Sequence, residues 1–120
     1  MRKGDIYLAD LGKSRNSFEF GKNRPVLIVQ SDKLNFAVEA GIYEHFLVCP
    51  LSTKDDYLTR EFRPRISARD ELEKDSFIVC SSVCFLHKNQ LIKKIATIGS
   101  RELKEIDGVL KNIFDLEDEG

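Results

Sequence analysis

Three kinds of polar side chain in this sequence stand where they could act on a phosphate group. The first is Arg24, which ends a polar segment at residues 11–24 and directly precedes the apolar run Pro25–Gln30. A guanidinium held beside a strand matches the oxygens of a phosphate and stays charged at any working pH. The same position also suits an arginine that forms an ordinary surface ion pair.

Hydroxyl and carboxyl groups accompany this arginine. Ser52 and Thr53 follow a long apolar run, so we expect them at the rim of a sheet, where a hydroxyl can bind a phosphate or pass a proton. Serine and threonine are also common turn residues. Glu19 lies in the same polar segment as Arg24 and could orient it or act as a base, although a loop glutamate is more often simply solvated.

The sequence predicts neither a metal site nor a cofactor. Cys80 and Cys84, with His45 or His87 nearby, resemble half of a zinc-binding set, but no CxxC pair is present. Together with Cys49 they make an odd count, which argues against a disulfide framework. Because Cys80 and Cys84 stand in an apolar run, we expect buried cysteines that act as small apolar side chains.

Short β-strands are the elements expected to position these residues. The runs that indicate strands are Asp5–Asp10, Pro25–Gln30, Ile42–Leu51, Phe62–Ser67, Ser76–Cys80 and Leu91–Ile98. Apolar residues then recur with helical spacing from Leu103 to Phe114, which predicts an amphipathic helix with Ser100 as its N-cap. The predicted fold class is mainly β (α+β), a small antiparallel barrel closed by a C-terminal helix.

Length and composition narrow the class of protein further. We expect the 120 residues to form a single domain, 1–120, with a frayed acidic end at 117–120. No apolar run approaches the ~20 residues of a membrane-spanning helix. The N-terminus lacks the apolar stretch of a secretory signal, so we expect a cytoplasmic protein with no membrane partner.

The net charge of −1 conceals an uneven distribution. Residues 101–120 contain three Lys/Arg and seven Asp/Glu, whereas residues 1–100 contain 16 Lys/Arg and 13 Asp/Glu. A modestly basic body can hold a local anion site, but it attracts a polyanion only weakly over long range.

The order of several motifs resembles that of a known family. Lys-Gly-Asp-Ile-Tyr at residues 3–7 is followed by Arg-Pro-Val-Leu-Ile-Val at 24–29, by Asn35, by Pro-Leu-Ser-Thr at 50–53 and by Ile-Ala-Thr-Ile at 95–98. This order, which extends over essentially the whole chain, resembles the MazF/PemK family of toxins from bacterial type II toxin–antitoxin modules. The first two motifs are the most specific.

The resemblance implies a fold, an activity and partners. The fold would be the SH3-like barrel with a C-terminal helix of the CcdB/MazF/PemK toxins. The activity would be a ribosome-independent endoribonuclease of the bacterial cytoplasm that cuts single-stranded mRNA at a short preferred sequence. Attack by the RNA's own 2′-hydroxyl would need no metal or other cofactor and would leave a 2′,3′-cyclic phosphate and a 5′-hydroxyl. The partners would be a second copy in a homodimer, with RNA crossing its interface, and a MazE-like antitoxin, through which the complex could bind operator DNA.

The resemblance also assigns site residues by motif position. Arg24 matches the family's catalytic arginine, and Ser52 falls on the catalytic hydroxyl position, with Thr53 as the alternative hydroxyl. Glu19 matches the loop glutamate of some members. The candidate RNA-binding residues are Lys22, Asn23, Arg63, Arg65 and Lys88.

The chain departs from the family pattern after residues 75–79. Many members carry an acid and then an arginine there, but here Ser81 and Cys84 occupy these positions. An aspartate base at position 81 is therefore excluded, and one phosphate contact is missing. The basic residues that could compensate are Arg60, Arg63, Arg65, Lys88 and Lys93.

Two other functions stay open at the level of the sequence. Gyrase-poisoning toxins resembling CcdB share the fold and bind a topoisomerase without cutting RNA. Their activity resides at the end of the C-terminal helix, and residues 114–120 lack the Trp-Gly-Ile type of ending found there. The other alternative is a degenerate family member that binds its antitoxin but cleaves RNA poorly, which Ser81 and Cys84 keep open.

Overall fold

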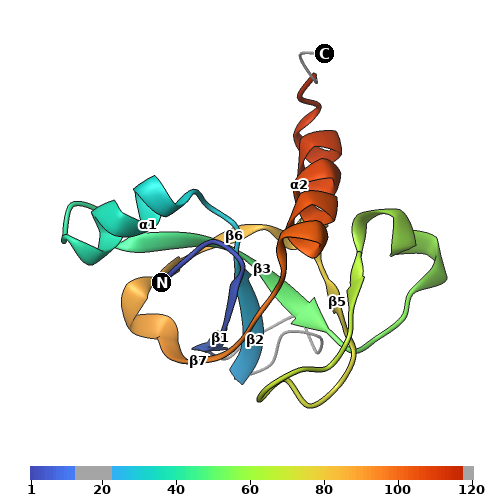
Figure 1. Cartoon of the computed structure of the whole chain (residues 1–120), viewed down its shortest axis with the longest axis horizontal. Coiled ribbons are helices and arrows are strands. Elements are labelled where there is room, and N and C mark those ends of the chain that lie inside the picture. The colour runs from blue at the N-terminus through green and yellow to red at the C-terminus, as the bar shows by residue number, and fades with distance from the viewer. Residues whose placement is uncertain (13–22, 118–120) are drawn as a thin grey trace.

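An antiparallel sheet curls around the core of the computed structural model, which describes residues 1–12 and 23–117 (Figure 1). Its strands are β1 (Asp5–Asp10), β2 (Asn23–Ile28), β3 (His45–Ser52), β4 (Arg65–Ile66), β5 (Ser76–Ile78), β6 (Cys84–His87) and β7 (Leu91–Thr97). The helices are α1 (Asp32–Glu39) and α2 (Ser100–Phe114), and the 3₁₀ segments are η1 (Tyr57–Phe62), η2 (Cys80–Ser82) and η3 (Lys88–Gln90). In this part of the chain no helix is long and apolar enough to cross a membrane.

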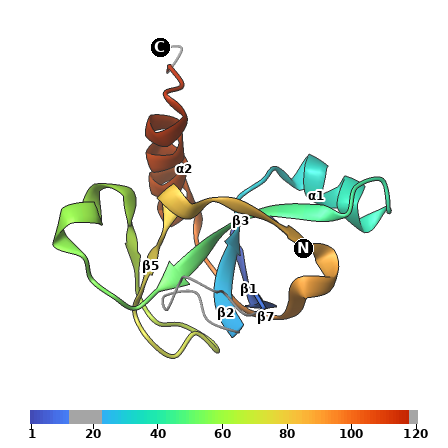
Figure 2. The same cartoon turned by 180° about the vertical axis from the view of Figure 1, so that it is seen from behind.

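Strand β3 is the centre of the sheet, whose order is β4-β5-β3-β2-β1-β7. One edge of β3 pairs with β2, and the other pairs first with β6 and then with β5. Between β5 and β6 the chain leaves the sheet as η2, and α2 packs against this short segment. Figure 2 shows β3 from behind, between β2 and β5.

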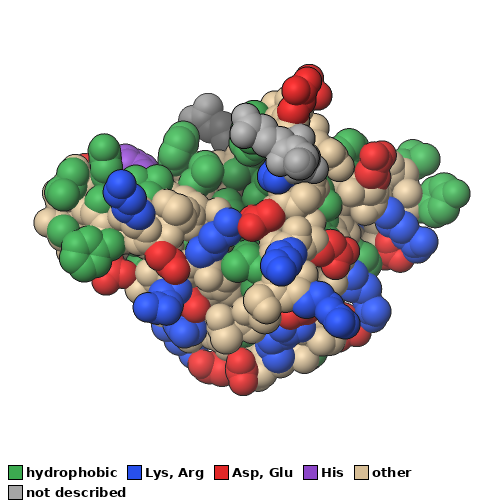
Figure 3. Space-filling model, turned by 45° about the horizontal axis from the view of Figure 1, so that its top comes forward, with side chains coloured by type: hydrophobic (Ala, Val, Ile, Leu, Met, Phe, Trp, Pro, Cys, Tyr) green, Lys and Arg blue, Asp and Glu red, His purple; other side chains and the backbone are tan. Residues whose placement is uncertain are grey.

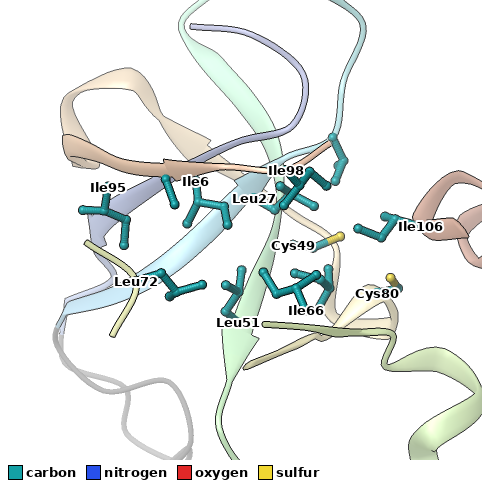
Figure 4. Packing of buried hydrophobic residues seen from close by; sticks show 13 residues of the cluster. Ile6, Leu27, Cys49, Leu51, Ile66, Leu72, Cys80, Ile95, Ile98 and Ile106 are labelled. Carbon is teal, nitrogen blue, oxygen red and sulfur yellow. The ribbon is translucent and has the colours of Figure 1, made fainter. Parts of the chain in front are cut away.

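The two ends of the curled sheet meet through residues 69–72. Arg69 and Leu72 form an isolated β-bridge, and the Glu71 N–H donates to the Ile95 carbonyl of β7 at 2.9 Å. The Leu72 side chain is buried among the core residues beside Ile95 (Figure 4). This contact brings the β4–β5 end of the sheet against β7, so the sheet encloses its apolar face.

Alternation along the strands divides the buried side chains into two clusters. Leu27, Cys49 and Leu51 point to the first cluster, which α2 covers with Ile106 (Figure 4). Val26 and Val48 point to the other face, where Val38 of α1 covers the second cluster. Because both faces of β2 and β3 are buried, burial of apolar area holds these two strands in one register.

The Lys-Gly-Asp motif is explained by a turn that leads into β1. Gly4 has a φ of +94°, its N–H donates to the Ile28 carbonyl at 2.9 Å, and its carbonyl accepts from the Ile98 N–H at 3.0 Å. Asp5, only 5% exposed, accepts a hydrogen bond from the Thr97 hydroxyl at 3.1 Å. The motif therefore joins the N-terminus to two strands at once.

The predicted fold class, a mainly β antiparallel barrel with a C-terminal helix, is confirmed. Three predicted details are wrong. Phe62–Ser67 is not one strand, because Tyr57–Phe62 forms η1 and only Arg65–Ile66 pairs. The N-cap of α2 is Gly99 rather than Ser100, which is the first helical residue. Cys84 is exposed rather than buried.

The first testable prediction concerns the ion pair that holds α2 to the barrel. Arg69 donates to both oxygens of Glu102 at 2.5 and 2.6 Å, and these side chains are 22% and 28% exposed. The Arg69 hydrogen bonds hold the pKa of Glu102 below its ordinary value of 4.5. We expect Glu102→Gln to lower the free energy of unfolding by about 1 kcal/mol at pH 7.

The pH dependence of this effect has a definite sign. Because the Glu102 pKa is lower in the folded chain, its stabilisation is complete above the unfolded pKa and disappears as the pH falls through the folded value. Urea unfolding at pH 7 and pH 3 measures this, with Glu105→Gln on the exposed side of the same helix as the control. An equal loss in both variants at pH 7 would contradict the prediction.

Candidate functional site

The register of β2 and β3 puts the candidate arginine and hydroxyl on one face of the sheet. Val26 lies opposite Pro50, and Ile28 lies opposite Val48, and the paired positions end at Val26 and Pro50. By alternation along each strand, Arg24 shares the face of Val26, and Ser52 shares the face of Pro50. Since residues directly opposite share a face, both side chains belong to the same face of the sheet.

Arg24 is held firmly at its backbone. It pairs with Ala9 of β1, which is fully buried, and Pro25 follows it directly. The arginine side chain is only partly buried. Within residues 1–12 and 23–117 it forms no ion pair, so in that part of the chain no carboxylate competes with an incoming phosphate for its guanidinium.

The two adjacent hydroxyls have different surroundings. Ser52 is 4% exposed, and its Oγ accepts a hydrogen bond from the Lys54 N–H at 3.1 Å, which leaves the hydroxyl proton to donate elsewhere. Thr53 is exposed and lines a cavity of about 570 Å³ together with Pro25, on the side opposite to Arg24. The structure therefore brings Ser52, and not Thr53, to the face of the arginine.

Of the other predicted residues at positions 11–24, only Asn23 is among the described residues. Glu19 and Lys22 lie outside the described residues. Asn23 is exposed and opens β2 opposite Asp10, one position before Arg24.

Two of the predicted RNA-binding arginines lie at the other side of Ser52. Arg63 and Arg65 line a second cavity of about 570 Å³ together with Arg60 and Phe77. Arg65 forms an exposed ion pair with Asp75 at 2.6 Å.

Arg60 is also paired in this cavity. It donates two hydrogen bonds to Asp55, at 3.0 and 2.7 Å, and these lower the pKa of that carboxyl. Sequence reasoning singled out the arginines but missed Phe77. The signal that could have found it is the alternation of Ser76–Ile78, which sends the middle residue of β5 to the opposite face.

Of the predicted lysines that the structure describes, Lys88 lies far from Ser52, whereas Lys93 lines the same cavity as Thr53. The Lys88 N–H donates to the Glu44 carbonyl at 2.8 Å, just before β3 begins, whereas Ser52 ends β3. Eight strand residues span roughly 25 Å. Lys93 forms an ion pair with Glu71 at 2.9 Å on the barrel seam.

The positions that depart from the family pattern are both exposed. Ser81 lies in η2 and Cys84 opens β6 opposite Val48. Cys49 and Cys80 are buried, and a hydrogen bond of the Cys49 thiol to Cys80, together with burial, raises the pKa of Cys49 far above its usual range. Among the residues that the structure describes, no group of three or more His, Cys, Asp or Glu could hold a metal ion.

Comparison with known proteins identifies the class to which this fold and site belong. Residues 2–114 match the family described as the PemK-like, MazF-like toxin of type II toxin–antitoxin systems. The chain is 30% identical over 114 residues to the endoribonuclease MazF of Staphylococcus saprophyticus, covering 92% of this chain and 88% of that relative.

Solved structures show the same fold at lower identity. A mycobacterial endoribonuclease in complex with its cognate antitoxin superposes with a TM-score of 0.75 at 17% identity, over 98% of each chain. Mycobacterium tuberculosis toxin MazF-mt6 gives 0.73 at 19% identity, over 95% of this chain and 99% of that one. A MazE–MazF structure from Deinococcus radiodurans gives 0.74 at 15% identity, over 98% and 97%.

The chain is therefore a toxin of the CcdB/MazF fold. More particularly, it belongs to the PemK-like, MazF-like toxin family of type II toxin–antitoxin systems.

The second prediction concerns the accessibility of the three cysteines. We expect iodoacetamide to alkylate Cys84 in the native protein, because it is exposed, and to leave Cys49 and Cys80 unmodified until the chain unfolds. Mass spectrometry of peptides after short native labelling measures this, and labelling in urea is the control that all three thiols can react. Native labelling of Cys49 at the rate of Cys84 would contradict it.

Proposed function

We propose that this toxin is an endoribonuclease that cuts single-stranded RNA without a metal ion, in the bacterial cytoplasm. The observation that carries the proposal is the shared face of Arg24 and Ser52 at the ends of two neighbouring strands. A guanidinium and a hydroxyl at the ends of two adjacent strands, on one face of the sheet, can both contact the oxygens of a single phosphodiester group. The relationship to a MazF endoribonuclease supports the same activity.

The reaction is a transesterification within the RNA. The 2′-oxygen attacks the adjacent phosphorus, its proton passes to a base, and the bond from phosphorus to the 5′-oxygen breaks. The leaving oxygen takes up a proton, so the products are a 2′,3′-cyclic phosphate and a 5′-hydroxyl. Arg24 stabilises the charge that develops on the phosphorane, which is the largest demand on the site.

Two further groups complete this proposed site. The Ser52 hydroxyl donates to a non-bridging phosphate oxygen, while the Lys54 N–H keeps its oxygen oriented. Glu19 positions Arg24 or the 2′-hydroxyl, or takes the 2′-proton as a base. Thr53 faces another cavity, so we assign it no contact with the phosphate that Arg24 binds.

Contacts on either side of the site bind the rest of the RNA. Asn23 and Lys22 precede Arg24 on one side, and Arg63 and Arg65 lie beyond Ser52 on the other. Lys88, at the far end of β3, contributes only to RNA that extends well past the cleaved linkage.

The proposed protein partners are a second copy of the chain and a MazE-like antitoxin. The mycobacterial and Deinococcus neighbours are complexes of toxin with antitoxin, which supports the second partner. An antitoxin that also binds operator DNA would carry the toxin with it.

A homodimer is supported by an exposed apolar surface beside α2. Phe85 is 70% exposed and lies opposite Leu47, which packs on the first core cluster. Phe114 and Leu116, at the end of α2, are 53% and 61% exposed. Figure 3 shows hydrophobic side chains gathered over the arm of α1 and between this arm and α2. Exposed apolar surface of this kind marks an interface between proteins.

The third prediction concerns cleavage. We expect the purified toxin to cut a long single-stranded RNA in EDTA at specific sites with 5′-hydroxyl ends. Arg24→Ala should lower the rate by about 10²- to 10³-fold, because the phosphorane loses its main charged donor. Arg101→Ala, an exposed arginine of α2, is the matched control and should keep the rate within about twofold. Mapping of RNA ends by primer extension measures both.

The same assay separates the two hydroxyls and the rival functions. Ser52→Ala should lose at least about tenfold in rate while the fold is retained, and Thr53→Val should not.

Equal losses of rate in Arg24→Ala and Arg101→Ala would contradict the assignment of the arginine. An absence of cutting with a trapped gyrase–DNA complex would favour a topoisomerase poison, and an absence of both with antitoxin binding intact would favour a degenerate toxin.

The fourth prediction concerns the homodimer. We expect Phe85→Lys to shift the protein from dimer to monomer in analytical ultracentrifugation, because a buried unpaired charge at an interface is costly. Leu58→Lys on η1, where Leu58 is 88% exposed, is the control and should leave the dimer intact. A monomeric wild type at micromolar concentration would refute the proposed dimer.

A further inference from the structure

The site continues across the sheet beyond Ser52. In the antiparallel pairing of β3 with β5, Ser52 lies directly opposite Phe77, and in the pairing of β5 with β4, Phe77 lies directly opposite Arg65. Because opposite residues share a face, the serine, the aromatic ring and the second guanidinium form a row on one face.

Phe77 stands out in this row because its ring has no place in either core. Its neighbours Ser76 and Ile78 are 3% and 0% exposed and point to the opposite face. Phe77 is only partly buried, and neither of the two hydrophobic clusters of the described chain includes it. The ring instead lines the cavity that the arginines Arg63 and Arg65 share.

The chemistry of this cavity suits one nucleotide. Its volume of about 570 Å³ lies within the range of small-ligand sites. The Arg65–Asp75 ion pair is exposed, with side chains 62% and 48% accessible, so it contributes little and a phosphate can displace it. The lining also contains two carboxylates, Glu105 and Asp55, of which Asp55 is paired with Arg60. An aromatic ring in one cavity with Arg63 and Arg65 is a combination that binds single-stranded nucleic acid through base stacking and phosphate contacts.

We propose that Phe77 stacks on a nucleobase of the bound RNA, next to the linkage that Ser52 contacts, and that Arg65 binds the phosphate of the same nucleotide. This inference rests on the proposed RNA-cleaving function and adds a subsite to it. The phenyl ring has no hydrogen-bonding group, so it contributes affinity and positioning more than choice between bases. Its place next to the cleaved linkage makes it a positioning residue for the reaction.

The test measures binding separately from cleavage. The probe is a 12-nucleotide RNA of mixed sequence in which every ribose is 2′-O-methylated, so no 2′-hydroxyl can attack. A set of twelve such oligonucleotides, each with one abasic position, is titrated against the wild type, Phe77→Leu, Phe77→Tyr and the control Phe36→Leu on α1. Thermal unfolding of each variant confirms that the fold is retained.

The expected result is a coupling between one base and one side chain. In the wild type and in Phe36→Leu, one abasic position should weaken binding by about 5- to 50-fold. In Phe77→Leu the intact probe should bind more weakly by a similar factor, and the same abasic position should add less than about twofold. Phe77→Tyr, which keeps the ring, should behave as the wild type does.

Failures of the two proposals give different results. If the wild type cleaves unmodified RNA but Phe77→Leu keeps full sensitivity to every abasic position, the stacking inference is overturned and the nuclease stands. If Phe77→Leu weakens only antitoxin binding, the cavity is a protein contact and the inference is likewise overturned. If the wild type neither cleaves nor binds RNA, both proposals fail.

Discussion

The pairing of β2 with β3 is the constraint on which the rest of the site depends. Leu27 and Cys49 face one buried cluster, whereas Val26 and Val48 face the other. A slip of one residue would exchange the two faces of a strand and send its side chains into the other cluster, where their sizes do not match the packing. The register that sets the faces of Arg24 and Ser52 is therefore fixed by the core and does not depend on any contact within the site itself.

Two ion pairs of arginine in this structure differ in their exposure to solvent. Arg69 and Glu102 are both less than one-third exposed and join α2 to the barrel, so their charges serve the fold. Arg65 and Asp75 are well exposed, and such a pair exchanges partners at little cost. With a modest net charge on the body, RNA would be recognised by short-range contacts more than by long-range attraction.

The sequence was most informative where burial is regular. The alternating and apolar runs predicted β1, β2, β3, β5, β7 and α2, because these elements bury a continuous face. Helix α1 escaped prediction since it has eight residues and buries only Asn35 and Val38, which leaves its apolar pattern weak. Strand β6 was missed because η2 interrupts the run from Phe77 to Phe85, a break that depends on packing against α2.

The candidate site was predictable to a similar degree. The type and position of Arg24 and Ser52 pointed to phosphate chemistry, but only the strand register shows that these two side chains share a face. The choice between Ser52 and Thr53 could not be made from adjacent residues of similar chemistry, because it depends on which face each one takes. The position of Phe77 in the cavity could not be predicted, because a phenylalanine within an apolar run is expected in the core until its partners across the sheet are known.

The brevity of β4 and β5 has a consequence for how substrates of different shape are accommodated. These strands have two and three residues: β4 pairs with β5 at two positions, and β5 pairs with β3 at two positions, whereas β1 pairs along its length with both β2 and β7. Local opening is least costly where backbone hydrogen bonds are few. The β1–β2 side of the site, which carries Arg24, is therefore rigid. The β4–β5 side opens more easily and can adjust to the shape of the bound RNA.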